Sequence, residues 1–106
     1  MVKWTDSIIG KIGFVDTNNN LFYKEAIKKI PKNARIMEAW ECMELLDNDF
    51  NAFKNIPKDE WYYTKSNNNY FRACGLSGLG DSFDALDMNL VSSSDALRGV
   101  LIVKKE

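Results

Sequence analysis

Oxygen-bearing side chains cluster late in the sequence, where their types and spacing could support metal chemistry. The cluster consists of Asp81, Asp84, Asp87 and Asn89. Carboxylate and amide oxygens are the ligands that Ca²⁺ prefers, but the spacing is not that of an EF-hand loop. A solvated acidic loop has the same composition. We therefore expect no metal ion here, and we keep Asp81 and Asp84 as candidate contact residues.

A glycine-rich segment, CGLSGLGD at residues 74–81, leads into this cluster. A phosphate-binding loop needs glycines ahead of a helix N-terminus, with a lysine and a serine or threonine in register. Here no lysine follows the glycines, and Asp81 would repel a phosphate. The segment is therefore more typical of a connecting or binding loop than of a nucleotide site.

Histidine does not occur in this sequence, and cysteine occurs only at Cys42 and Cys74. A histidine general base, a Ser–His or Cys–His nucleophile pair and a histidine-ligated metal are thus excluded. Two cysteines are too few for a disulfide framework or a structural zinc site made of cysteines alone. We expect free thiols, no cofactor and no catalytic activity.

Positive and negative charges are nearly balanced over the chain, which has 106 residues, 14 basic and 15 acidic side chains and a net charge of −1. A duplex-DNA binder needs a surplus of cations, so nucleic acid is not an expected partner. Residues 1–35 nevertheless hold seven basic and three acidic side chains, and residues 36–53 hold five acidic and no basic ones. The lysines at positions 24, 28, 29 and 32 could steer an acidic partner, or they could be an ordinary solvated helix face.

The composition, with 45% apolar and 27% charged residues, is that of an ordinary globular domain. The N-terminal residues contain no apolar signal-peptide core, and no run approaches the ~20 apolar residues of a membrane span. We expect one domain, residues 1–106, made in the cytoplasm and without a membrane partner. The oligomeric state is left open.

Hydrophobic patterning predicts a strand at 11–15, a helix at 21–30 and a second helix from 36 to about 46. Asn19 or Asn20 would cap the first helix, and Pro31 would end it. The second helix would bury a stripe of Ile36, Ala39, Trp40, Met43 and Leu46 and expose Glu38, Glu41 and Glu44. The asparagine triplets at 18–20 and 67–69 are predicted to be turns.

The second half of the chain is richer in strand signals. A helical turn at 50–53 is followed by two aromatic-rich runs, WYYT at 61–64 and YFRAC at 70–74, which predict a hairpin. Residues 75–94 are expected to form a long irregular loop. The nearly continuous apolar run at 97–103 predicts a strand at the centre of the sheet. The expected class is α+β, with two helices packed on a small mixed or antiparallel sheet.

Taken in order, these segments resemble the minimal C-type-lectin-like fold. They are similar to the bacterial and phage relatives of the formylglycine-generating-enzyme (sulfatase-modifying factor) group. The matching segments are GFVD at 13–16, LFYKEA at 21–26, ARI at 34–36, WYYTKS at 61–66 and RGVLIV at 98–103. Met37 stands where the family has proline, and Glu38 where it has threonine.

The resemblance implies that ligands bind on the hairpin and loop face. The candidate contact residues there are Trp61, Tyr63, Tyr70, Arg72, Asp81 and Asp84. We expect a non-catalytic recognition module for a protein or glycan ligand, encoded by a phage or mobile element, such as a virion decoration, fibre or receptor-binding component. The alternative is a small intracellular inhibitor that binds a host defence-system protein through its loop and its acidic helix, which carries Glu38, Glu41 and Glu44.

Overall fold

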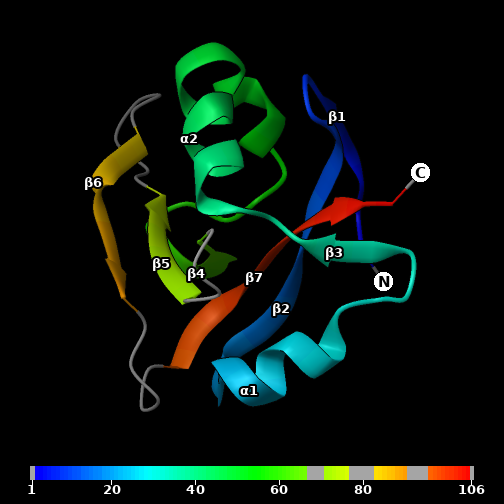
Figure 1. The fold of residues 1–106 in the computed structure, drawn as a ribbon, viewed down its shortest axis with the longest axis vertical. Coiled ribbons are helices and arrows are strands. Elements are labelled where there is room, and N and C mark those ends of the chain that lie inside the picture. The colour runs from blue at the N-terminus through cyan, green and yellow to red at the C-terminus, as the bar shows by residue number, and fades with distance from the viewer. Residues whose placement is uncertain (1, 67–70, 77–82, 91–95, 106) are drawn as a thin grey trace.

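The computed structural model describes residues 2–66, 71–76, 83–90 and 96–105, with 71–76, 83–90 and 96 as backbone only (Figure 1). The elements are β1 (Thr5–Ser7), β2 (Gly10–Phe22), α1 (Tyr23–Ala26), η1 (Ile27–Lys29), β3 (Ala34–Ile36), α2 (Ala39–Asn48), η2 (Phe50–Phe53), β4 (Glu60–Lys65), β5 (Phe71–Leu76), β6 (Phe83–Leu90) and β7 (Ala96–Lys104). The class is α+β, as predicted.

One sheet holds all the described strands, in the order β1-β2-β7-β4-β5-β6, with β3 also paired to β7. Strand β4 runs parallel to β7, and the other pairs are antiparallel. The prediction of a central strand at 97–103 is confirmed, because β7 pairs with β2, β3 and β4. Its four residues 100–103 are buried, which explains why the run is apolar without alternation.

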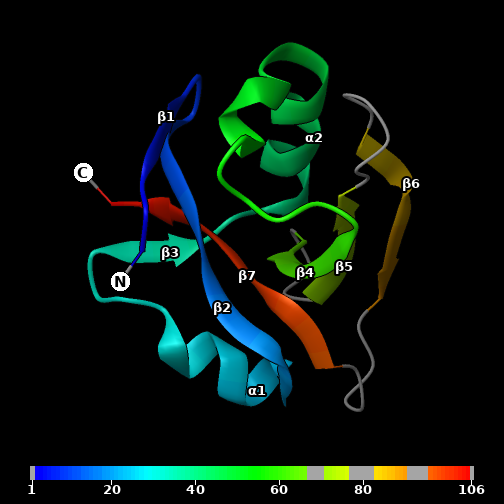
Figure 2. The ribbon, with the colours of Figure 1, turned by 180° about the vertical axis from the view of Figure 1, so that it is seen from behind.

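Two hydrophobic cores lie on opposite faces of β7. Leu101 and Val103 pack in a cluster with Cys42 and Leu45 of α2. Val100 and Ile102 pack in a second cluster, which includes Ala26 of α1. Successive side chains of a strand point to opposite faces, so each helix covers its own side of the strand. Figures 1 and 2 show α2 toward one end of the molecule and α1 toward the other.

Gly99 lets β2 and β7 approach each other closely at the middle of the sheet. A Cβ at this position would lie 2.3 Å from the carbonyl oxygen of Val15. Gly13 likewise allows the N-terminal residues to approach β2 closely, because a Cβ at this position would lie 2.6 Å from Cγ1 of Val2. The N-terminal residues can therefore lie flat on β2.

The first predicted helix is wrong in its bounds. Strand β2 continues through the asparagine triplet to Phe22, and only α1 and the short η1 follow. The residue at the N-cap is Phe22, not Asn19 or Asn20. Asn18 and Asn19 do adopt left-handed backbone, with φ of 54° and 59°. They form a bulge, seen as a register shift against β7, and not a chain reversal.

The second helix begins at Ala39, three residues later than predicted, because Ile36 belongs to β3 and pairs with Ile102. Glu38 is the N-cap residue and forms a capping box with Glu41. The buried residues of α2 are Glu41, Cys42 and Leu45, so the predicted stripe is displaced around the helix.

The hairpin and the helical turn are confirmed, since β4 pairs antiparallel with β5 and η2 spans Phe50–Phe53. The irregular stretch is corrected in part, because β6 occupies residues 83–90 and pairs with β5. The rest of that stretch, and the second asparagine triplet, lie outside the described residues.

Candidate functional site

The sequence-predicted contact residues meet only in part on the β4–β5–β6 sheet edge. Trp61 on β4 is 38% exposed and stands opposite Gly75 of β5, which in turn pairs with Asp84 of β6. Arg72 stands opposite Thr64 in the same ladder. Trp61 and Asp84 thus share one row across three strands. Two further contact residues, Tyr70 and Asp81, lie outside the described residues.

Tyr63 lies in the core, although it was predicted as a contact residue. Its side chain is fully buried in the cluster that contains Val100 and Ile102. Its hydroxyl donates a hydrogen bond to the carbonyl oxygen of Leu21 at 2.8 Å and accepts one from the backbone N–H of Leu97 at 3.1 Å. A ring held in this way contributes to the fold, and in this structure it presents no surface to a partner.

The exposed side of α2 forms a surface that includes Trp40 and Met43, two residues that the sequence patterning placed in the core. We call it the α2 surface and define it by Glu38, Trp40, Met43, Glu44 and Asp47. Trp40 is 53% exposed and Met43 is 44% exposed. Positions 40, 43, 44 and 47 share one helix face, because residues three and four apart are neighbours on a helix. The surface therefore combines two large apolar side chains with three carboxylates.

Trp40 is held in place on this surface by its neighbour at the start of the helix. The indole N–H of Trp40 donates a hydrogen bond to Oε2 of Glu38. Such a contact restricts the ring before any partner arrives, which lowers the ordering cost of binding. No basic residue lies between positions 36 and 53, so the charged side chains of α2 itself are all negative.

Glu41 belongs to the interior, so the predicted set of three exposed glutamates on α2 is wrong for this residue. Its carboxylate is buried and accepts two hydrogen bonds from the guanidinium of Arg35, at 2.7 and 2.8 Å, and one from the N–H of Glu38 at 3.0 Å. Burial opposes its ionisation, but Arg35 and the Glu38 amide outweigh this and lower the pKa of Glu41 below its usual range.

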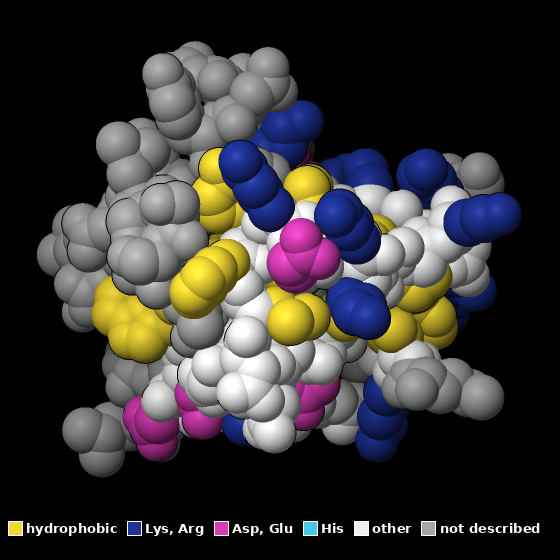
Figure 3. Space-filling view, turned by 90° about the horizontal axis from the view of Figure 1, so that it is seen from below, with side chains coloured by type: hydrophobic (Ala, Val, Ile, Leu, Met, Phe, Trp, Pro, Cys, Tyr) yellow, Lys and Arg dark blue, Asp and Glu magenta, His cyan; other side chains and the backbone are white. Residues whose placement is uncertain are grey.

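Lysine side chains dominate the end of the molecule that carries α1. Figure 3 shows Lys and Arg side chains gathered around a carboxylate, with apolar patches between them. A pocket of about 670 Å³ opens nearby, between the N-terminal residues, β2 and the chain after η1. Lys3 and Lys29 contribute to its lining, together with Trp4 and Pro31. Sequence patterning had identified the lysines but not this pocket.

Within the part of the chain that the structure describes, neither a cluster of potential metal ligands nor a membrane-spanning helix is found. No group of three or more His, Cys, Asp or Glu side chains that could hold a metal ion occurs there. The side chains of Asp84, Asp87 and Asn89 on β6 are not described, and Asp81 lies outside the described residues. None of the described helices is long and apolar enough to cross a membrane.

No protein-family model, curated protein or solved structure matches this chain. Three surfaces of the molecule are therefore the candidates for function: the α2 surface, the region around the exposed Trp61 on β4, and the lysine-rich end with its pocket.

Proposed function

We propose that this chain is a non-catalytic recognition module that binds another protein through the α2 surface. One observation carries the proposal: Trp40, a large aromatic side chain, is more than half exposed and is fixed by a hydrogen bond to Glu38. Tryptophan is the residue type most enriched among the side chains that dominate binding energy at protein interfaces.

The charge around Trp40 specifies the kind of partner. Glu38, Glu44 and Asp47 surround the two apolar side chains, and α2 has no basic residue. A partner surface with lysine or arginine around an apolar pocket would match this pattern and would be guided to it by long-range attraction. The proposed ligand is therefore a basic protein surface.

This arrangement favours the inhibitor hypothesis over a virion component. The hypothesis assigns binding to the acidic second helix, where Glu44 is exposed and Glu38 is half-buried, although Glu41 is buried. In that case the chain, encoded by a phage or mobile element, would block a host defence-system protein by occupying its basic surface. Burial of Glu41 even helps, because its ion pair with Arg35 holds the first turn of α2 in position.

A second candidate face is the β4–β5–β6 edge. Its support is the exposure of Trp61 and the shared row of Trp61 and Asp84. On this alternative the chain would be a C-type-lectin-like module that binds a protein or glycan as part of a particle. The central β7 strand, the two helices and the β4–β5 hairpin are consistent with that fold, and an experimental structure compared with C-type-lectin-like domains would test it.

Two matched tryptophan variants distinguish binding through the α2 surface from binding through the β4–β5–β6 edge. Wild-type chain, Trp40→Ala and Trp61→Ala would each be immobilised and exposed to a lysate of the source organism's host, and the captured proteins compared by quantitative mass spectrometry. The proposal expects a specific basic protein that is captured by wild type and by Trp61→Ala but is lost with Trp40→Ala. Both rings are partly exposed, so neither truncation should unfold the chain, and thermal melting would check this.

The opposite pattern, in which capture survives Trp40→Ala and is lost with Trp61→Ala, would assign binding to the β4–β5–β6 edge and overturn the α2 proposal. A Glu44→Lys variant adds a charge test. It should weaken capture of the same protein, and unchanged capture would exclude a basic partner surface at this position.

A further inference from the structure

The pocket at the α1 end is built from three segments that are distant in sequence. Its walls are the N-terminal residues 2–4, residues 14–16 of β2 and the chain from Lys29 to Asn33. Gly13 allows the first wall to lie directly on β2, since a side chain there would collide with Val2. Lys104 lies over the Trp4 ring, with its Nζ 5.8 Å from the ring centroid. These contacts hold the N-terminal wall against the sheet.

The lining of the pocket combines apolar side chains with exposed cations. Trp4, Val15 and Pro31 are half-buried, whereas Lys3 and Lys29 are exposed. No ion pair within 4 Å is formed by either lysine among the described residues. A volume of about 670 Å³ lies within the ~300–1,000 Å³ typical of ligand pockets. The site can thus take an apolar group with negative charge beside it.

Among the described residues of the lining Asp16 is the one acidic side chain, and it is paired with Arg98, which also contacts Glu60. The guanidinium of Arg98 donates to both of its carboxylate oxygens, at 3.0 and 3.2 Å. The same contact holds the pKa of Asp16 below its usual range. Among the described residues Asp16 forms its ion pair with Arg98 and none with Lys3 or Lys29.

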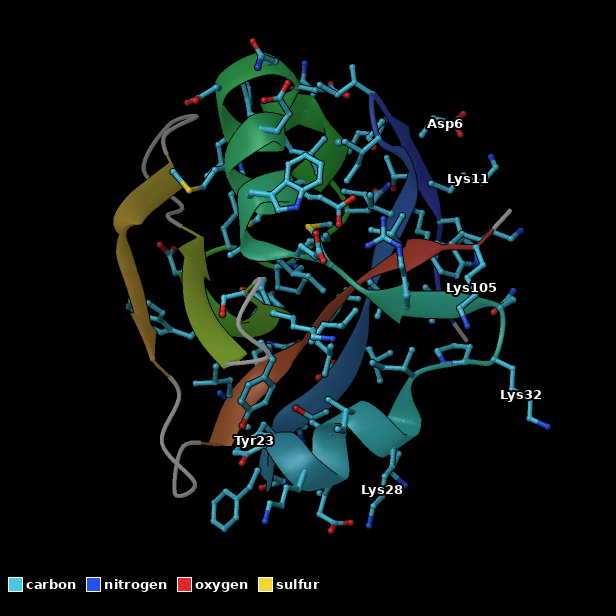
Figure 4. The ribbon with its side chains drawn as sticks, in the orientation of Figure 1. Asp6, Lys11, Tyr23, Lys28, Lys32 and Lys105 are labelled. Atoms are coloured by element: carbon cyan, nitrogen blue, oxygen red, sulfur yellow. The ribbon has the colours of Figure 1, made fainter. Side chains whose placement is uncertain are left out.

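Further lysines extend the cationic surface away from the pocket. Lys24, Lys28 and Lys32 are exposed on α1, η1 and the chain that follows, and Glu25, 3.4 Å from Lys28, is the only carboxylate in residues 17–37. Lys105 is brought to the same end because its N–H donates to the carbonyl oxygen of Asn33 at 2.7 Å. Figure 4 shows Lys28, Lys32 and Lys105 at successive positions along this side of the molecule.

We propose that this pocket and the lysines around it bind an acidic peptide segment that carries an apolar side chain. The apolar side chain enters the pocket beside Trp4 and Pro31, and flanking carboxylates of the peptide lie against Lys3 and Lys29. This is a second binding site, independent of the α2 surface and opposite to it in charge. It would let the chain contact two proteins, or two parts of one partner, at once.

The chemistry of the site favours a peptide over a nucleic acid. The cations at the pocket edge are lysines, which bind carboxylates and phosphates alike as point charges, so the aromatic content of the site makes the distinction. Single-stranded nucleic acid also binds through grooves in which several aromatic rings stack on successive bases. Here the described lining holds two aromatic rings that already have partners: Trp4 contacts Lys104, and Phe14 packs edge-on against Tyr62.

The test uses the whole chain, isotope-labelled for NMR, and a short peptide in which phenylalanine is flanked by paired glutamates. We expect saturable shifts of the Trp4 indole N–H and of residues 29–33. A peptide with glutamine in place of glutamate, and one with glycine in place of phenylalanine, should each bind more weakly. Equal binding of the glutamine peptide would overturn the proposal.

Paired lysine variants give the matched control. Lys3→Gln combined with Lys29→Gln should weaken peptide binding about fivefold. Lys54→Gln combined with Lys58→Gln removes the same charge from exposed positions outside the pocket and should leave the affinity within about twofold. Equal weakening by both pairs would reveal non-specific attraction and contradict the assigned site.

An oligothymidylate is titrated under the same conditions. If it shifts the same resonances and binds more tightly than the acidic peptide, the site is a nucleic-acid surface and the peptide proposal is wrong. Because Trp40→Ala leaves this pocket intact, peptide binding by that variant separates failure of this proposal from failure of the α2 proposal.

Discussion

Tyr63 and Leu97 are joined by a hydrogen bond at the point where the β2–β7 ladder is interrupted. The backbone N–H of Leu97 donates to the Tyr63 hydroxyl at 3.1 Å, and that hydroxyl donates in turn to Leu21. Leu21 and Leu97 are register partners just beyond the bulge in β2. Thr17 assists, because its hydroxyl lies 2.9 Å from the carbonyl oxygen of Leu97 and 3.0 Å from that of Arg98. Side-chain hydrogen bonds thus replace the backbone hydrogen bonds between β2 and β7 that the bulge removes.

Replacing Tyr63 with phenylalanine tests this role. The variant keeps the ring in the core but leaves the Leu97 N–H and the Leu21 carbonyl without their side-chain partner. We expect a loss of about 1–3 kcal/mol in the free energy of unfolding, with the denaturant slope unchanged. Urea unfolding followed by tryptophan fluorescence measures it. An unchanged midpoint would mean that water satisfies both backbone groups.

The backbone conformation of the bulge predicts that substitutions at the adjacent Asn19 and Asn20 differ in their effect on stability. Asn19 has a φ of 59°, a conformation that β-branched residues adopt only at a cost of about 1–2 kcal/mol, whereas Asn20 is not in this region. Asn19→Val should therefore lower the unfolding free energy by about that amount and Asn20→Val by distinctly less. Thermal melting of the two variants side by side checks this, and equal losses would place the strain elsewhere.

The Arg35–Glu41 pair predicts a pH-dependent contribution to stability. The pKa of Glu41 is lowered in the folded chain, so its ionised form favours folding at pH values above the unfolded pKa of about 4.3. This stabilisation is lost as the pH falls through the lower folded value. Glu41→Gln should cost about 1–3 kcal/mol near neutral pH.

Unfolding curves for wild type and Glu41→Gln should converge in acid, because protonated glutamate and glutamine then make similar contacts. Glu44→Gln is the matched control, since this exposed neighbour should change stability by no more than about 0.5 kcal/mol at any pH. A gap for Glu41→Gln that stays constant from neutral to acid pH would show that packing, and not the charge, accounts for its cost.

Two glycine variants separate steric exclusion from backbone strain. Gly99→Ala would place a methyl group 2.3 Å from the Val15 oxygen and push β2 away from β7, at a cost of about 3 kcal/mol or more. In Gly10→Ala the added methyl group has no atom within 4 Å, so the loss of unfolding free energy comes only from the backbone φ of +114° and should be about 1–2 kcal/mol. Denaturant midpoints of both variants are the measurement, and a milder effect at Gly99 would contradict the close contact described for the sheet.

The sequence-based prediction of the fold was most accurate for segments with a strong local hydrophobic pattern. The apolar run at 97–103 and the aromatic hairpin runs became β7, β4 and β5, because buried central strands need apolar side chains on both faces. The triplet at 18–20 was predicted to be a turn, and Asn18 and Asn19 do adopt the left-handed backbone that many turns use. A turn and a bulge share that conformation, however, and only pairing with the distant β7 makes it a bulge.

The wrong predictions concern residues whose burial depends on contacts with other elements of the fold, and the local sequence pattern does not reveal those contacts. Trp40 was assigned to the core and Glu41 to the surface, but Arg35 makes burial of Glu41 favourable and thereby turns Trp40 outward. Strand β6 was missed because FDALDMNL is rich in aspartate, a residue type depleted in strands, and its pairing with β5 overrides that preference. The pocket at the α1 end joins three distant segments, so no local signal could indicate it.

The position of β7 constrains the order in which this protein can fold during synthesis. Strands β1–β2 and β4–β6 are made first, yet the described ladders link these two halves only through β7. Until residues 96–104 have left the ribosome, each half exposes an unpaired strand margin to the cell, a condition that invites aggregation. Closure of the sheet must therefore follow translation of its final strand, and premature termination before that strand would release a chain unable to complete its core.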